Sequence, residues 1–158
     1  MSAGARPRFT VLIYNYNHEA EVGPAIQSVL DQDFPASEVA ILVVDDGSTD
    51  RSSEVIDSFR DKVRRIYQEN QGQTRAFHNG FAATRGEIVC LLDSDDFYHP
   101  RRLSALSERF EDPGVVAAQN YMGRVDGRGK VLASGQPSWP DRFTLDHFQD
   151  HQFHFGAT

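Results

Sequence analysis

The sequence has a single cysteine, Cys90, among its 158 residues. One cysteine excludes an internal disulfide, and its position in the apolar run IVCLL indicates a buried, inert thiol in a reducing compartment. No stretch approaches the roughly 18 to 20 apolar residues of a membrane span. The N-terminus, MSAGARPRF, lacks the apolar core of a secretory signal. We therefore expect a cytoplasmic protein with no transmembrane segment.

Basic residues are also scarce. The 16 lysines and arginines are outnumbered by 23 aspartates and glutamates, which gives a formal net charge of −7 at pH 7. Proteins that bind nucleic acid need a basic face, so this composition argues against nucleic acid as a partner. Motifs of the types GxxxxGK[ST], GxGxxG, CxxC and HExxH are absent. Their absence excludes a P-loop and argues against a zinc site.

The chain does contain short apolar runs that alternate with amphipathic stretches. Residues 1–8 read as a loose tail. Strands are predicted at 9–14, 39–44, 63–68, 87–92 and 115–122, and helices at 19–31, 51–60, from ENQG to about Thr84, and from Pro100 to Phe110. A Gly-rich turn predicts a hairpin over 123–133. Fully apolar strands alternating with helices predict an α/β fold, with a mostly parallel sheet covered by helices on both faces.

Polar and acidic turns follow three of these strands: NYNHE, DDGS and DSDD. Ligands of such sheets bind beyond the carboxyl ends of the strands, so these turns should share one edge. The carboxylates expected to face one another there are Asp45, Asp46, Asp93, Asp95 and Asp96. Hard divalent cations prefer carboxylate oxygens. The pattern therefore favours a metal-assisted ligand site.

Other interpretations of these turns exist. An EF-hand loop starting at Asp93 would need Gly and Glu where Tyr98 and Ser104 stand. DSDD could be a solvated turn in which Ser94 or Asp96 caps the following helix, but a second acidic turn at an equivalent strand end makes this weaker. The asparagines of NYNHE could form a turn, or could offer amides to a base or sugar beside a tyrosine. His18, isolated in the sequence, is interpreted as a surface or capping residue.

Together these residues resemble the inverting glycosyltransferases of family 2, which have the GT-A fold. The match runs from about Phe9 to Leu103. FTVLIYNYNHE resembles the family's opening strand and turn, AILVVDDGSTD the second, and ENQGQTRAFHNGFAATRGEIVCLLDSDD the central helix, strand and D-x-D motif. YHPRRL resembles the segment after the motif. The specific feature is DDGS about 45 residues before a D-x-D, each closing an apolar strand.

The resemblance implies a Rossmann-like GT-A domain over residues 9–136, which transfers a sugar from a nucleotide diphosphate sugar to a hydroxyl with inversion. The donor would be a UDP-, GDP- or dTDP-sugar, and the acceptor a glycan, lipid or protein. Mn²⁺ or Mg²⁺ would neutralise the leaving diphosphate. The implied nucleotide-binding residues are Tyr14, Tyr16, Asn17, Asp45, Asp46 and Asp93. Asp95 would bind the metal, and Asp96 would either share it or cap the helix.

Two departures from the family pattern stand out. Many members carry an Arg-Asn pair where Phe77 and His78 stand, and Arg75 is our candidate for the phosphate or acceptor contact. Inverting transfer also needs a general base, which the family supplies from its second half. The carboxylates after residue 112 stand in no matching context: Asp126, Asp141, Asp146 and Asp150. The catalytic base is thus unassigned.

We therefore expect a domain that is incomplete at its C-terminus. The alternative function is a catalytically incomplete nucleotide- or metal-binding module that acts through assembly. The aromatic, histidine-rich segment 137–158 would then pack over an exposed face or form a homodimer contact.

Overall fold

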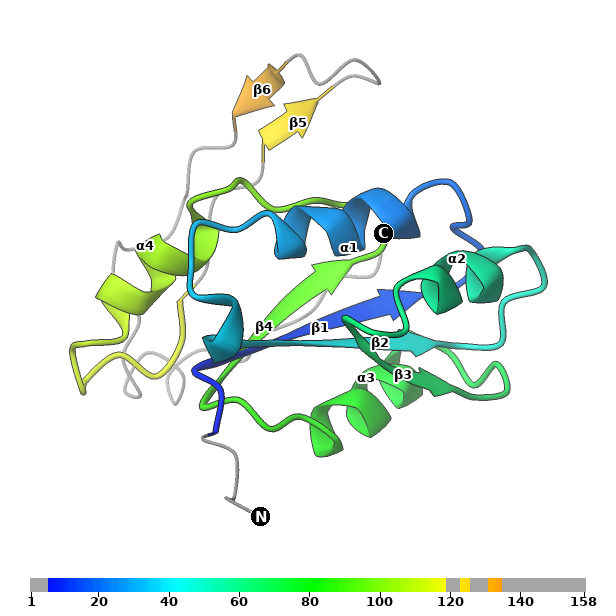
Figure 1. Ribbon diagram of the computed structural model, residues 1–158, viewed down its shortest axis with the longest axis horizontal. Helices are drawn as coiled ribbons and strands as arrows, with labels where there is room; N and C mark the ends of the chain where they lie inside the picture. Colours follow the sequence, from blue (N-terminus) through cyan, green and yellow to red (C-terminus); the bar gives the residue numbers. More distant parts are fainter. Residues whose placement is uncertain (1–5, 119–122, 126–130, 135–158) are drawn as a thin grey trace. The chain divides into compact units, whose positions relative to one another are not determined.

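Four parallel strands form the sheet that the apolar runs predict (Figure 1). The computed structural model describes residues 6–118, 123–125 and 131–134. The chain separates into two compact units, Met1–Ser104 and Ala105–Thr158, and the sheet lies in the first. Its strands are β1 (Phe9–Asn15), β2 (Val39–Asp45), β3 (Arg64–Tyr67) and β4 (Ile88–Asp93). The sheet contributes the layer on which the site is built.

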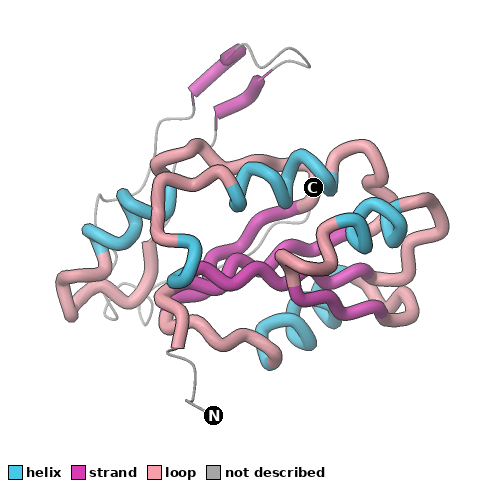
Figure 2. Tube along the Cα trace, viewed as in Figure 1, coloured by secondary structure: helices cyan, strands magenta, loops and turns pink. Residues whose placement is uncertain are grey.

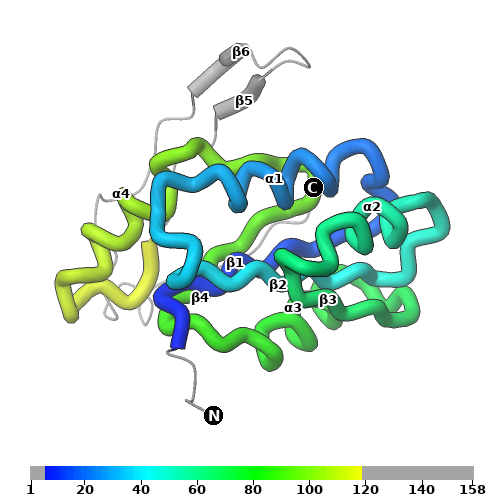
Figure 3. Tube along the Cα trace, in the orientation of Figure 1, coloured from blue at the N-terminus to red at the C-terminus, as the bar shows by residue number. Residues whose placement is uncertain are grey.

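The strand order is β3-β2-β1-β4, so the chain moves outward from β1 to β3 and then returns to the other side of β1 (Figure 3). Asn15 pairs with Asp45 in the register of β1 and β2, and Tyr14 pairs with Asp93 in that of β1 and β4. The turns after β1, β2 and β4 therefore leave the same edge of the sheet. Reversal of strand order at β1 marks the position where such sheets bind ligands.

Helices cover both faces, as predicted (Figure 2). Helices α1 (Val22–Leu30) and α2 (Ser52–Ser58) contact each other on one face, whereas α3 (Gln73–Ala82) packs against β1 and β2 on the other. Helix α1 buries four residues at helical spacing: Val22, Ala25, Ile26 and Val29. A 3₁₀ turn occupies Ala36–Glu38, and α4 runs over Arg102–Arg109. The apolar periodicity identified the buried side of α1, whereas α3 buries Ala76 and Gly80 and leaves the predicted apolar residue Phe81 54% exposed.

The core is apolar on both sides of the sheet. On the α3 side, Leu12, Leu42, Val44 and Ala76 form a buried cluster. The Cys90 side chain is buried as expected, and burial raises the pKa of its thiol to about 11. A thiol with that pKa stays protonated at neutral pH, which agrees with an inert role.

Three predictions need correction. Residues 6–8 are not a loose tail, because the Arg6 side chain donates to the carbonyls of Arg85 and Gly86, and Pro7 and Arg8 accept from the start of β4. Residues 115–118 form no strand, and 119–122 lie outside the described residues. Strand β4 is not fully buried: it is an edge strand, and 49% of Leu91 is exposed.

The predicted hairpin is confirmed. Strands β5 (Gly123–Val125) and β6 (Val131–Ser134) pair antiparallel. The segment 137–158 lies outside the described residues, so its predicted packing and the domain boundary at 136 stay predictions. Within the described ranges, no helix is both long and apolar enough to cross a membrane.

Candidate functional site

The site is built from three segments at the carboxyl edge of the sheet. We call residues 15–19 the opening turn, residues 45–48 the DDGS loop and residues 93–96 the DSDD turn; they follow β1, β2 and β4. Backbone hydrogen bonds join them, since Asp46 N–H donates to the Asn15 carbonyl and Ser94 N–H donates to the Tyr14 carbonyl. The opening turn therefore lies between the two acidic segments.

Asp45 is held by protein donors. Only 3% of it is exposed, and its carboxylate accepts from Asn15 Nδ2 at 2.7 Å and from the Ser48 N–H and hydroxyl at 2.9 and 2.6 Å. Asn15 is itself fully buried and its Nδ2 lies 3.1 Å from the Ser48 hydroxyl. These contacts lock the DDGS loop against the opening turn.

Asp46 fastens a different segment. Its carboxylate is fully buried and accepts from Gln68 Nε2 at 2.7 Å, Gln71 N–H at 3.0 Å and Gly72 N–H at 2.8 Å. Gly72 is the N-cap of α3 and has a positive φ of 84°, which favours glycine. Asp46 thus sets where α3 begins, four residues later than the ENQG motif suggests.

Asn17 also makes a turn contact. Its φ of 56° is in the left-handed region, which asparagine tolerates better than most residues. Its side-chain oxygen accepts from Thr49 N–H at 2.7 Å, and its own N–H donates to the Ser48 hydroxyl at 2.9 Å. Both asparagines of NYNHE therefore serve the turn, and a contact of Asn17 with a nucleotide stays a prediction.

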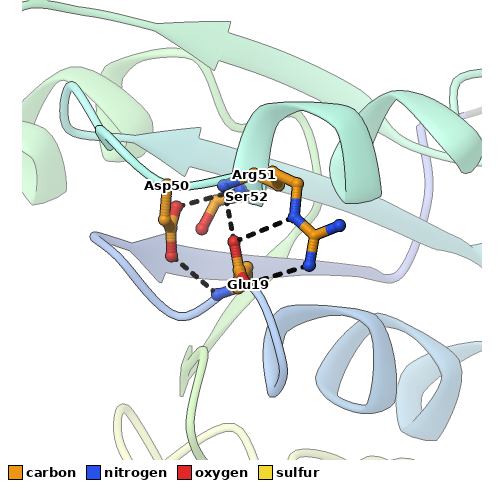
Figure 4. Close-up of polar contacts among 4 residues, drawn as sticks. All are labelled: Glu19, Asp50, Arg51 and Ser52. Carbon is orange, nitrogen blue, oxygen red and sulfur yellow. Dashed lines mark hydrogen bonds and ion pairs between the residues drawn. The ribbon is translucent and has the colours of Figure 1, made fainter.

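Charged residues also join the opening turn to the residues that follow the DDGS loop (Figure 4). Glu19 accepts from Arg51 N–H at 2.7 Å and from Arg51 Nη2 at 3.2 Å, while Asp50 accepts from the N–H groups of Glu19 and Ser52. The side-chain hydrogen bond from Arg51 is the main cause that lowers the pKa of Glu19. Burial opposes ionisation of Asp50, but its hydrogen bonds with Ser52 and Glu19 lower its pKa overall.

The DSDD turn presents its carboxylates to solvent. Asp93, Asp95 and Asp96 are exposed, whereas Ser94 is 1% exposed and lies 2.7 Å from His18 Nδ1 through its hydroxyl. Burial, followed by repulsion from Asp95, raises the pKa of both Asp93 and Asp96. Like charges are therefore held together here, at an electrostatic cost that a cation would offset.

Neither Ser94 nor Asp96 makes a hydrogen bond to the start of α4. Within residues 6–118, the N–H of Leu103 donates to Gln32 Oε1, and that of Arg101 donates to His99 Nδ1. The donors at this helix start have other partners, so the capping interpretation of DSDD is wrong for this structure. Asp96 is left free to face a ligand.

Tyr14 lies between the acidic segments. Its ring packs on the buried cluster below α3, and burial, followed by repulsion from Asp46 and Asp93, raises the pKa of its hydroxyl. Tyr16 is half-buried on the same turn. Tyr14 thus lies near the carboxylates predicted to bind the nucleotide, and Tyr16 is close enough to influence Tyr14.

The carboxylates suit a hard cation. In the described part of the chain, no group of three or more His, Cys, Asp or Glu side chains converges on one point. Mg²⁺ is commonly bound by one or two carboxylates together with substrate phosphates, and the exposed Asp95 and Asp96 offer that donor set. Arg75 is exposed in the first turn of α3, where Gln73 Nε2 lies 3.4 Å from Asp93 Oδ1.

Two residues that hold the site together were not identified from the sequence. His18 was interpreted as a surface or capping residue, but it contacts the middle residue of the D-x-D motif. Gln68, which lies in a predicted strand, holds Asp46. Both residues stand at the carboxyl ends of strands, and that position was the signal that could have identified them.

Comparisons with known proteins agree with this geometry. The sequence description of Glycosyl transferase family 2 matches residues 10–158. An uncharacterised glycosyltransferase of Nostoc sp. is 39% identical over 137 residues, which cover 84% of this chain and 42% of that protein. The chain thus spans less than half the length of this curated relative.

Two solved structures share the fold. The Staphylococcus aureus protein TarS in complex with UDP-GlcNAc has a TM-score of 0.60 and 27% identity, covering 66% of this chain and 31% of TarS. The Pyrobaculum calidifontis mannosyltransferase PcManGT in complex with GDP-Man and Mn²⁺ has a TM-score of 0.63 and 25% identity, covering 70% and 34%. These similarities confirm the predicted GT-A fold. The family description matches nearly the whole chain, residues 10–158, and the chain therefore belongs to glycosyl transferase family 2.

Proposed function

We propose that this chain is the donor-binding part of a glycosyltransferase that transfers a sugar, with inversion, from a nucleotide diphosphate sugar to a hydroxyl acceptor. The observation that carries the proposal is the position of the opening turn, which is hydrogen-bonded to the DDGS loop on one side and to the DSDD turn on the other. The similar solved structures contain UDP-GlcNAc or GDP-Man, which supports a UDP- or GDP-sugar donor; dTDP is the third nucleotide to test.

The residues divide into two groups in this proposal. The nucleotide would be contacted by Tyr14, Tyr16, Asn17, Asp45, Asp46 and Asp93. The Asp45 and Asp46 carboxylates already accept several protein hydrogen bonds. In this proposal they therefore line the nucleotide pocket with negative charge at fixed positions. The two tyrosine rings offer flat surfaces to the base, and Asp93, which is exposed, is free to accept from a ribose hydroxyl.

The exposed Asp95 and Asp96 would hold Mn²⁺ or Mg²⁺. A divalent ion there would supply positive charge that offsets the negative charge developing on the leaving diphosphate. Without a cation, the acidic turn would repel a diphosphate, so the carboxylates themselves favour metal-dependent binding. Arg75, exposed at the start of α3, is the proposed second cation for the phosphate or acceptor.

The acceptor would be a glycan, lipid or protein hydroxyl, and the family supplies the base from its second half. The alternative is a binding module without turnover, which acts through assembly as a homodimer or with another chain. The single buried cysteine supports a reducing compartment such as the cytoplasm.

Calorimetric titration of the protein with UDP, GDP and dTDP, each with and without Mn²⁺, tests the proposal. We expect Mn²⁺-dependent binding of one diphosphate that is lost in Asp95→Ala. Asp61→Ala is the matched control, because Asp61 is also an exposed carboxylate but lies just before β3, at the amino end of the sheet. Failure of all three diphosphates to bind the folded protein would refute the donor site.

A second measurement separates the enzyme from the module. Transfer from the matching nucleotide sugar to a mixture of glycan, lipid and peptide acceptors is expected only for the enzyme. Binding of the diphosphate without any transfer would favour the module, in which the donor site persists without its base.

A further inference from the structure

The side chains of the opening turn divide between its two neighbours. Asn15, Asn17 and Glu19 make their side-chain hydrogen bonds to the DDGS loop or to the residues just after it. His18 alone among the residues of this turn bonds a side chain of the DSDD turn. The imidazole is thus the side-chain link from the proposed nucleotide pocket to the proposed metal ligands.

The partner of His18 is Ser94, which lies between Asp93 and the proposed metal ligand Asp95. Ser94 is 1% exposed and is held twice: its N–H donates to the Tyr14 carbonyl at 3.1 Å, and its hydroxyl shares a 2.7 Å hydrogen bond with His18 Nδ1. The donor of that second bond is set by the tautomer of the imidazole. A buried hydroxyl needs a hydrogen-bond partner, and His18 is the one that it has.

The anchored serine determines how its neighbours face. The N–H of Asp96 donates to the Asp93 carbonyl at 3.0 Å, so the four residues form a tight turn. With Ser94 directed inward, the exposed Asp93 and Asp95 on either side of it are directed to solvent. Loss of the His18 bond would release the inner side chain and allow the turn to rotate.

We propose that His18 is a positioning residue that acts through Ser94 to hold the DSDD turn in the orientation in which Asp93 faces the ribose and Asp95 binds the divalent metal. The inference rests on the proposed function and adds to it a residue outside the D-x-D motif. Residues that orient metal ligands without touching the metal commonly change metal affinity 10- to 100-fold when they are removed. His18 is suited to this role because its side chain is short and ends in a rigid ring. The side chain reaches from the turn after β1 to the turn after β4.

The electrostatic surroundings agree with this placement. His18 lies close enough to Asp93 to favour its ionised form, although burial and Asp95 dominate and raise the pKa of Asp93. The arginines of the neighbouring segments are directed to other carboxylates, since Arg51 bonds Glu19 and Arg102 acts on Asp96.

The test measures Mn²⁺ affinity directly, by electron paramagnetic resonance of free Mn²⁺, for the full chain without nucleotide. We expect His18→Ala and Ser94→Ala each to weaken binding about 10-fold or more, and the double variant to be no weaker than either, because both remove the same link. His18→Asn should restore most of the affinity, since the asparagine amide can reach the same hydroxyl. Amide exchange at Ser94 and Asp96 in the metal-free protein should accelerate in His18→Ala.

Glu19→Ala is the matched control. It loosens the same turn by removing the bond to Arg51, which lies on the DDGS side, and should leave Mn²⁺ affinity unchanged. Equal Mn²⁺ affinity of His18→Ala and wild type, or equal losses in His18→Ala and Glu19→Ala, would overturn the positioning role while the proposed function stands. A wild-type protein that binds neither Mn²⁺ nor any of the three diphosphates would overturn both.

Discussion

Replacement of Asp46 by asparagine tests whether this carboxylate holds the start of α3 in place through its hydrogen bonds. Asp46 Oδ1 accepts from Gln68 Nε2 and Gln71 N–H, and Oδ2 accepts from Gly72 N–H. Asparagine has the same shape but keeps one acceptor oxygen. With that oxygen in the Oδ1 position, its amide nitrogen would face the N–H of Gly72, and the other two bonds would lose their charge.

The magnitude follows from these three contacts. Leaving the Gly72 N–H unpaired costs about 1–3 kcal/mol, and neutralising the acceptor weakens the other two bonds by about 1 kcal/mol each. We therefore expect Asp46→Asn to lower the free energy of unfolding by about 3–5 kcal/mol, a large part of the roughly 5–15 kcal/mol typical of a domain. Asp61→Asn, at an exposed site, should change it by less than about 0.5 kcal/mol.

Urea unfolding followed by far-ultraviolet circular dichroism measures the change, and amide exchange at Gln71 and Gly72 locates it. Both amides should exchange faster in Asp46→Asn, because they lose their acceptor or its charge. Unchanged stability together with unchanged exchange would show that these hydrogen bonds do not hold the start of α3. If nucleotide binding were then lost, Asp46 would act on the ligand itself, and the fastening role would be wrong.

Three further predictions concern the surrounding turns. Gly47→Ala should lower stability by about 2–4 kcal/mol, because φ there is +73° and an added Cβ would lie 2.6 Å from the Asn70 nitrogen; the change in melting temperature measures it. Glu19 has a lowered pKa in the folded state, so the stability from its bond to Arg51 should be present above the unfolded pKa near 4.5 and be lost as pH falls through the lower folded value; Glu19→Gln should lose this pH dependence in acid titration of the melting temperature. Asp96 has a raised pKa, so the stability it contributes is present below the unfolded pKa near 3.8 and is lost as pH rises through the folded value; Asp96→Asn should therefore raise the melting temperature of the metal-free protein at pH 7, and an unchanged or lower value would contradict the repulsion.

Local patterns in the sequence determined the elements and the edge of the sheet that carries the site. The apolar runs ending in NYNHE, DDGS and DSDD became β1, β2 and β4, and their parallel pairing brought the three turns to one edge. This was predictable because strand burial and turn chemistry depend on neighbouring residues, and because parallel strands must present their carboxyl ends together. The proposed metal ligands Asp95 and Asp96 follow from the same reasoning.

Only the tertiary structure decided what each side chain does at that edge. Asp46 and Asp93 look alike in the sequence, yet Asp46 is fully buried under protein donors while Asp93 is exposed, because donors 22 to 26 residues away reach the first of them. His18 and Ser94 are 76 residues apart and meet because β4 pairs with β1 on the side opposite β2. The exposure of Leu91 has the same origin, since β4 lies at the edge. Strand order depends on contacts between distant segments, and no local period or turn motif encodes it.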